Sequence, residues 1–279
     1  MSTKPKRVFI TNDMEGTTGV VDWSQVGSDQ LEYEKYRKLM VGDLNAAIEG
    51  ALASGVKEIT ISDSHGKMKN LHPWEVNEAA TLIRGSPKPF SMMAGISDEF
   101  DAALFVGYHA RRGTPNAVLC HTYTLGVIAV YINGIELGEF GINAALAGHY
   151  GVPSIFISGD AAVATEAKAL IPEIKTAALK KGMGRYAAEC IHPDKTGPII
   201  RKMVSEALIS YEEIEPFRLE TPVKLQVELV SATSADAASI LPYIERLDGR
   251  TVAAVFDDYP TAYRGLNGIF YLASGAERR

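Results

Sequence analysis

Apolar runs of strand length alternate with longer helical patterns through the first two thirds of the chain. Residues 8–11 form the first apolar run, and residues 32–53 follow with apolar side chains recurring every three to four positions. Such alternation is typical of an α/β fold, because strands joined by helices lie parallel in one sheet. We therefore predict a largely parallel sheet flanked by helices. The expected strands are residues 8–11, 56–62, 102–107, 117–120, 127–132 and 153–158.

The last third of the chain follows a different order. Two expected strands, residues 223–230 and 250–257, are interspersed with helical patterns at residues 197–213, 234–247 and 260–273. This order predicts a smaller C-terminal α+β part. We therefore divide the chain into a main α/β domain, residues 1–200, and a C-terminal subdomain, residues 201–279.

Charge and composition exclude some classes of function. The net charge is −6 and no segment gathers Lys and Arg, so a nucleic-acid-binding surface is not expected. No run approaches the roughly 18 apolar residues of a transmembrane helix, and the first residues lack the apolar core of a secretory signal. Two cysteines do not make a disulfide framework. We expect a soluble, cytoplasmic protein with neither nucleic-acid nor membrane partners.

Two acids, Asp13 and Glu15, come directly after the first expected strand and before a glycine-rich bend. Side chains two residues apart on a strand point to the same face, so these carboxylates are expected to lie side by side. Two like charges held together are unfavourable unless a positive group lies between them. The alternative is that the acids cap the next helix or pair with surface lysines.

Three histidines also lie close to the ends of expected strands. His65 follows residues 56–62, His109 follows residues 102–107, and His121 follows residues 117–120. Ligands of open α/β sheets bind outside the carboxyl ends of the strands. Carboxylates and imidazoles that converge there make a transition-metal site, with zinc favoured, and such a set can hold two metals. Taken singly, each histidine is better explained by a hydrogen-bonded structural role, and only their shared location favours a metal site.

Glu139 has the same strand parity as the apolar residues Ile135 and Leu137, if its segment is a strand. A buried carboxylate needs a partner, which is either a metal or an arginine. Asp63 precedes His65 by two residues and either supports it or stabilises a turn. Asp160 follows a strand and is expected to cap the next helix, with a role in holding a substrate amine as the alternative.

Several longer segments occur in an order that resembles a known family. These are NDMEG at 12–16, SDSHGKMKN at 62–70, KPFSMM at 88–93, GYHARRGTP at 107–115, YINGIELGEFGINA at 131–144 and SGD at 158–160. Together they resemble the DppA-type D-aminopeptidases, a family of metallopeptidases. The resemblance covers most of the first 200 residues, whereas the C-terminal part carries no matching motif.

The resemblance implies two Zn²⁺ ions per subunit in residues 1–200, which would be the metal-binding catalytic domain. Asp13 would bridge the ions, and the two pairs that complete their ligands would be Glu15 with His65 and His109 with Glu139. His121 matches an additional catalytic histidine of the family. The family is also similar in forming large ring-like homo-oligomers that restrict substrates to short peptides.

The implied chemistry is removal of the N-terminal residue from a short peptide or amino-acid amide by a zinc-bound hydroxide. The resemblance alone implies a preference for D-residues. One alternative is a dinuclear phosphoesterase, for which Arg111 and Arg112 are the nearest phosphate-binding candidates. The other is a non-catalytic peptide-binding or transport-associated protein.

Overall fold

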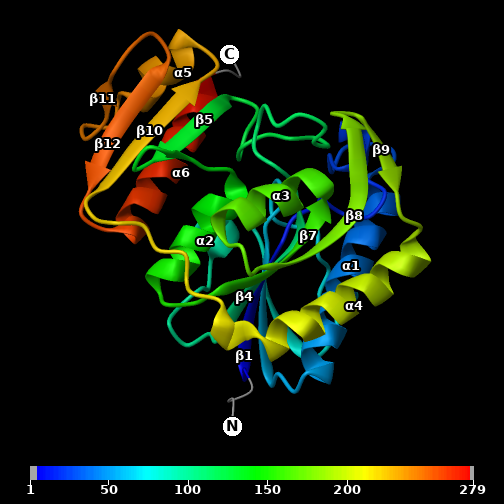
Figure 1. Ribbon diagram of the computed structural model, residues 1–279. Helices are drawn as coiled ribbons and strands as arrows, with labels where there is room; N and C mark the ends of the chain where they lie inside the picture. The colour runs from blue at the N-terminus through cyan, green and yellow to red at the C-terminus, as the bar shows by residue number, and fades with distance from the viewer. Residues whose placement is uncertain (1–4, 277–279) are drawn as a thin grey trace.

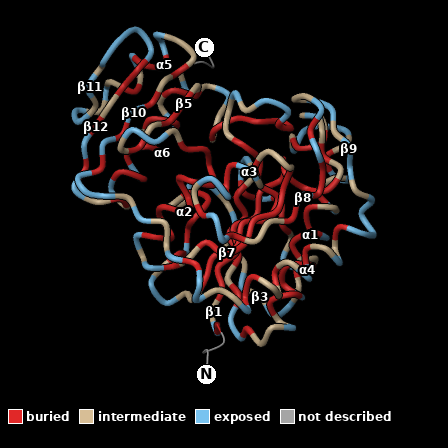
Figure 2. Tube along the Cα trace, viewed as in Figure 1, coloured by how far each residue is buried: buried red, intermediate tan, exposed pale blue. Residues whose placement is uncertain are grey.

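The computed structural model describes residues 5–276, and its centre is a seven-stranded sheet in the order β3-β2-β1-β4-β7-β8-β9. All neighbouring strands are parallel except β8 and β9. Every residue of β4 and β7 is buried, and Figure 2 shows this sheet as the buried centre of the molecule. The strands are β1 (Arg7–Asn12), β2 (Glu58–Asp63), β3 (Ala80–Ile83), β4 (Ala102–Tyr108), β7 (Ser154–Asp160), β8 (Lys175–Gly184) and β9 (Ala187–Cys190).

Helices cover both faces of this sheet (Figure 1). α1 (Tyr33–Ala53) packs against α4 (Pro193–Ile209) on one face, and α2 (Glu139–His149) and α3 (Ala161–Leu170) cover the other. The contact between α1 and α4 is close at Gly50, where a Cβ atom would meet the backbone of Arg201. The predicted α/β class, with a largely parallel sheet flanked by helices, is confirmed.

The order in which strands are added to the sheet reverses between β1 and β4. From β1 the chain passes through α1 to β2 on one side, whereas β4 leads through α2 to β7 on the other side. Such a switch point leaves a crevice at the carboxyl ends of the two central strands, where ligands of these folds bind. Asp13 follows β1 and His109 follows β4, so both residues lie at this crevice.

A second, antiparallel sheet has the strand order β11-β12-β10-β5-β6. β10 alternates buried and exposed residues, as expected of a sheet with one face covered, here by α5 (Ala232–Ala238) and α6 (Tyr259–Ala276). No described helix is both long and apolar enough to span a bilayer. The strands are β5 (Val127–Ile132), β6 (Ile135–Glu136), β10 (Val223–Leu229), β11 (Glu245–Arg246) and β12 (Thr251–Phe256).

The second sheet joins distant parts of the chain. β5 pairs with β10, so residues 127–132 do not continue the parallel sheet as their place in the alternation suggested. The strands after residue 200 thus complete a sheet that begins within the first 200 residues, and the division at residue 200 stays a prediction. The helical pattern at residues 234–247 forms a helix only as far as Ala238, and the helix expected at 197–213 spans Pro193–Ile209.

The expected strand at residues 117–120 is absent. This segment is a buried turn in which Leu119 has a φ of 49° and the main-chain nitrogen of Val118 donates to the carboxylate of Asp160. Its run of apolar side chains predicts a strand, because a buried turn and a buried strand give the same run of apolar residues. The nearby residues Asn133 and Gly134 form the turn of a hairpin between β5 and β6.

Candidate metal centre

Five of the six site residues predicted from the sequence meet at the crevice, and the sixth, His121, lies beside them. All three carboxylates are buried. Nδ1 of His65 lies 3.0 Å from Oε2 of Glu15 and 3.3 Å from Oδ1 of Asp13. Nε2 of His109 lies 3.5 Å from Oδ2 of Asp13 and 3.3 Å from Oε1 of Glu139. The two oxygens of Asp13 therefore face two different histidines.

Glu139 reaches this cluster from a helix. It is the first residue of α2, so the condition that its segment is a strand does not hold, although the expected burial is correct. At this position the positive end of the helix dipole favours a carboxylate. His121 also comes from a loop instead of a strand, and its Nε2 lies 3.6 Å from Glu139 Oε1 and 3.9 Å from Glu15 Oε1.

Each histidine uses one ring nitrogen to donate to a main-chain carbonyl. His65 donates from Nε2 to Val26 at 2.9 Å, and His109 donates from Nδ1 to Ala110 at 3.0 Å. His121 donates from Nδ1 to Leu119 at 2.9 Å. A carbonyl can only accept, so the other ring nitrogen of a neutral imidazole keeps its lone pair. These lone pairs all face the carboxylates, which is the arrangement of metal ligands oriented by outer hydrogen bonds.

The cluster is electrostatically strained without a cation. Burial, together with the charge of Glu15, raises the pKa of Asp13 to about 8. Against the effect of burial, the neighbouring acids raise the pKa of His65 and His109 well above the usual value. Burial and the charge of His109 lower the pKa of His121, which is therefore the neutral histidine of the group.

A metal ion fits this arrangement better than protons do. Oδ2 of Asp13 and Nε2 of His109 are buried and have no hydrogen-bond partner among the described residues. Ligand atoms about 2.0–2.2 Å from a tetrahedral zinc are about 3.3–3.6 Å apart, close to the separations seen here. Three groups of possible ligands have their ligand atoms within 4.8 Å of one another: Asp13 with Glu15 and His65, Asp13 with His109 and Glu139, and Glu15 with His109 and His121.

Comparison with known proteins supports this assignment. Residues 6–268 match the peptidase family M55, described as D-aminopeptidase. A curated D-aminopeptidase of Bacillus subtilis strain 168 is 38% identical over 245 residues, which is 88% of this chain and 89% of that protein. The chain belongs to the M55 D-aminopeptidase family. The resemblance inferred from the order of the motifs is thereby confirmed.

A solved M55 structure agrees along nearly the whole chain. It is described as a Zn-dependent D-aminopeptidase DppA from Bacillus subtilis, a self-compartmentalizing protease, and is 37% identical. The superposition has a TM-score of 0.94 and covers 96% of this chain and 98% of the other. The fold of this M55 peptidase therefore includes β10, β12 and α6, which belong to the C-terminal part where the sequence offered no motif.

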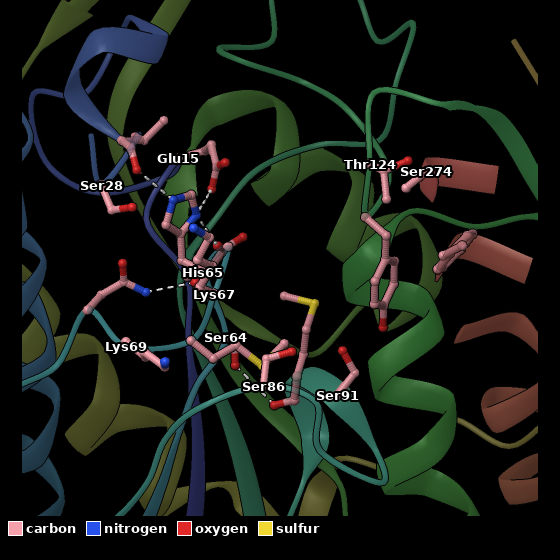
Figure 3. Close-up of a pocket in the computed structure, with 18 of the residues that line it drawn as sticks. Glu15, Ser28, Ser64, His65, Lys67, Lys69, Ser86, Ser91, Thr124 and Ser274 are labelled. Atoms are coloured by element: carbon pink, nitrogen blue, oxygen red, sulfur yellow. Dashed lines mark hydrogen bonds and ion pairs between the residues drawn. The ribbon is translucent and has the colours of Figure 1, made fainter. Parts of the chain in front are cut away.

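The cluster of carboxylates and histidines opens into a cleft of about 1030 Å³. Figure 3 shows Glu15 and His65 on one wall, with Thr124 and Ser274 across the cleft. The far wall comes from α6, through Asn267, Phe270 and Tyr271 among others. A cavity of this size exceeds one amino acid, so this M55 peptidase has room for a short peptide.

Lys180 of β8 is a buried residue that the sequence analysis missed. Its Nζ donates to three main-chain carbonyls of the loop after β1, those of Glu15 at 2.6 Å, Thr17 at 2.9 Å and Val20 at 2.6 Å. Asp43 of α1 accepts from the nitrogen and hydroxyl of Thr18 in the same loop. The loop that carries Glu15 is thus held from both sides, by partners more than 20 residues away in sequence.

Glycines allow this loop to approach the end of β4. A Cβ atom on Gly16 would overlap the main chain of Tyr108, and one on Gly107 would overlap the carbonyl of Asp13. Gly107 also has a φ of 72°, in the left-handed region that favours glycine. The close approach places Asp13 against His109.

The remaining sequence candidates have structural roles. The Asp63 carboxylate accepts from the main-chain nitrogens of Asn70 and Leu71, so it stabilises the turn after His65. Asp160 caps α3 through Val163, and its second oxygen accepts from residue 118. Both Asp160 oxygens are therefore engaged, which leaves no support for a role in holding a substrate amine. Cys120 is buried.

Zinc binding to this M55 peptidase should weaken as the pH falls. In the metal-free protein Asp13 holds a proton below about pH 8, and the raised pKa values of His65 and His109 favour a proton on each of these rings. Zinc requires these ligands deprotonated, so each released proton changes the affinity by about tenfold per pH unit. Calorimetry at pH 7 in buffers of different ionisation enthalpy should detect proton release. An affinity that is constant between pH 6.5 and 8 would contradict the assignment.

Proposed function

We propose that this chain is a zinc-dependent aminopeptidase that removes the N-terminal residue, in the D configuration, from short peptides or amino-acid amides. One observation carries the proposal: three carboxylates and three histidine lone pairs converge at the switch point of an M55 peptidase fold. The D configuration is inferred from the relatives, which are named D-aminopeptidases.

We infer two zinc ions per subunit, with Asp13 between them. The two oxygens of Asp13 face His65 and His109 separately, and each of these histidines has a glutamate beside it. In this arrangement Glu15 and His65 would complete the ligands of one ion, and His109 and Glu139 would complete those of the other. Two divalent cations would also offset the three buried negative charges.

When bound, zinc polarises a substrate carbonyl and lowers the pKa of its water to about 7. His121 is placed to carry a proton from this water to the leaving amine. Its Nδ1 is committed to the Leu119 carbonyl, so the lone pair of Nε2 faces the cluster, and its lowered pKa keeps the ring neutral. In the proposed mechanism His121 accepts a proton and then donates it to the leaving amine.

The ring of His121 is held on both sides. It stacks on His109 with ring centroids 4.1 Å apart, and it makes a T-shaped contact with Trp23 with ring centroids 5.5 Å apart. These contacts restrict rotation of the imidazole, so Nε2 stays aimed at the carboxylates. A proton carrier that is fixed within reach of the reacting atoms is an effective one.

A dinuclear phosphoesterase is the weaker alternative, because the expected phosphate-binding residues are engaged elsewhere. Arg111 pairs with Glu136 at 3.3 Å and Glu166 at 3.5 Å. Nη1 of Arg112 donates to the carbonyls of Leu125 and Val127. Neither arginine lines the cleft.

We also infer that the chain forms a ring-like homo-oligomer. The solved relative is described as a self-compartmentalizing protease, a term for an assembly that encloses its active sites. Light scattering after size-exclusion chromatography should give a mass of several subunits. A monomer across the tested concentrations would reject this inference.

A substrate panel tests the proposed activity. The protein is stripped with a chelator, reloaded with zinc, and assayed on matched D- and L-amino-acid amides, short peptides and phosphate monoesters. We expect hydrolysis of D-residue amides and peptides that is lost on chelation and restored by zinc. Phosphate-ester hydrolysis alone would favour the phosphoesterase, and no hydrolysis after reloading would favour a non-catalytic protein.

A further inference from the structure

Tyr123 contacts the first two turns of α2 through two different groups. Its main-chain nitrogen donates to Oε1 of Glu139 at 2.6 Å, and its phenol donates to Oδ1 of Asn143 at 2.7 Å. Glu139 and Asn143 are four residues apart and therefore lie on the same face of the helix. Tyr123 thus determines where the Glu139 carboxylate points. Its φ of 58° is unusual for a residue other than glycine, so surrounding contacts must hold it there.

Those contacts come from α6, in the C-terminal part of the chain. The hydroxyl of Tyr263 lies 2.7 Å from the hydroxyl of Tyr123 and donates to Oδ1 of Asn143 at 2.7 Å. The ring of Phe270 lies 4.8 Å from the ring of Tyr123. Tyr263 and Phe270 are seven residues apart, so one face of α6 holds both ends of the Tyr123 side chain.

The same network continues to the strands that carry the other ligands. Nδ2 of Asn143 donates to the hydroxyl of Tyr108 at 3.0 Å, and this hydroxyl lies 2.8 Å from Oγ1 of Thr11. Tyr108 directly precedes His109, and Thr11 precedes Asp13 by two residues. Thr11, Tyr108, Asn143 and Tyr263 are all buried. Hydrogen bonds in such a low-dielectric network are strong and fix one geometry.

We propose that Tyr263 is a positioning residue for the metal centre. Through Tyr123 and Asn143 it fixes the carboxylate of Glu139, so that α6 sets the affinity for the ion that Glu139 and His109 hold. This gives the C-terminal part a role in metal binding besides its contribution to the cleft wall. The inference rests on the proposed zinc site, and its test separates the two.

Tyr259 provides a matched control on the same helix. It lies one turn before Tyr263, is also buried, and its hydroxyl also donates to α2, to the carbonyl of Ile142 at 2.8 Å. It makes no hydrogen bond to Tyr123 or Asn143 among the described residues. Tyr263→Phe and Tyr259→Phe each remove one buried hydroxyl, so a purely structural role predicts similar effects for both.

The test measures zinc affinity of the full-length metal-free protein by competition with a chelator of known affinity. We expect Tyr263→Phe to lower the affinity for one of the two zinc ions by about 10- to 100-fold. This is the usual effect of losing a hydrogen-bond partner of a metal ligand. Tyr259→Phe should leave both affinities within about threefold of wild type. Thermal unfolding of the metal-free variants should show similar midpoints.

A double variant strengthens the test. Tyr123→Phe removes the other hydroxyl of the pair. The double variant Tyr123→Phe/Tyr263→Phe should therefore lower the zinc affinity by less than the product of the two single effects. Wild-type affinity in Tyr263→Phe, or an equal loss in Tyr259→Phe, would overturn the inference while leaving the zinc site intact. Wild-type protein that binds no zinc would instead reject the proposed function, and this inference with it.

Discussion

Asp13→Asn is expected to abolish binding of both zinc ions and to reduce hydrolysis by at least about 10³-fold, because a metal supplies several kcal/mol of transition-state stabilisation. The amide nitrogen of asparagine has no lone pair for a metal, so the variant cannot bridge. Oδ1 of Asp13 also accepts from the nitrogen of Met14, a bond that asparagine can keep. Zinc per subunit after dialysis, measured by mass spectrometry, checks the prediction.

The same substitution should leave the metal-free fold intact. With a pKa of about 8, Asp13 carries a proton at pH 7 in the metal-free protein, and asparagine resembles that protonated form. The unfolding midpoint at pH 7 should therefore be unchanged. Asp29→Asn is the control, since Asp29 lines the cleft but belongs to none of the ligand groups. Full zinc content in Asp13→Asn would show that Asp13 is not the bridge.

His121→Gln is expected to keep both zinc ions and to lower kcat by about 10²- to 10⁴-fold, the usual contribution of a general acid–base residue. Glutamine cannot carry a proton between water and the leaving amine, whereas the proposed ligands are untouched. KM should change much less than kcat. Steady-state kinetics on one amide substrate, with zinc content measured on the same sample, tests this.

Zinc content also distinguishes whether His121 is a proton carrier or a metal ligand. Glu15, His109 and His121 form one of the groups with ligand geometry, so loss of one zinc in His121→Gln would make His121 a ligand instead of a proton carrier. His149→Gln is the control, because His149 lies at the end of α2, outside all three groups. This control should keep both its zinc content and its kcat.

The position of the site could be predicted because it depends on topology. The carboxyl ends of parallel strands meet at one edge of a sheet, so a strand assignment is enough to bring Asp13, His65 and His109 together. Errors of one or two residues at the strand ends do not change this outcome. β1, for example, ends at Asn12, before either acid of the bend.

Other features required contacts that no local pattern reveals. Glu139 was predicted to be buried by strand parity, yet it begins a helix, because its apolar neighbours fit either period. Lys180 looks like a surface lysine in sequence and is buried only because the loop after β1 presents three carbonyls to it. Tyr123 and Tyr263 are 140 residues apart, and their pairing depends on how α6 packs against α2.

We propose that Asp13 lies between two zinc ions. Anomalous diffraction at the zinc absorption edge, from crystals of the zinc-loaded protein, tests this position directly. We expect two peaks about 3.5–4 Å apart on either side of the Asp13 carboxylate. One peak should lie beside Glu15 and His65, and the other beside His109 and Glu139. A single peak, or zinc bound only outside this cluster, would contradict it.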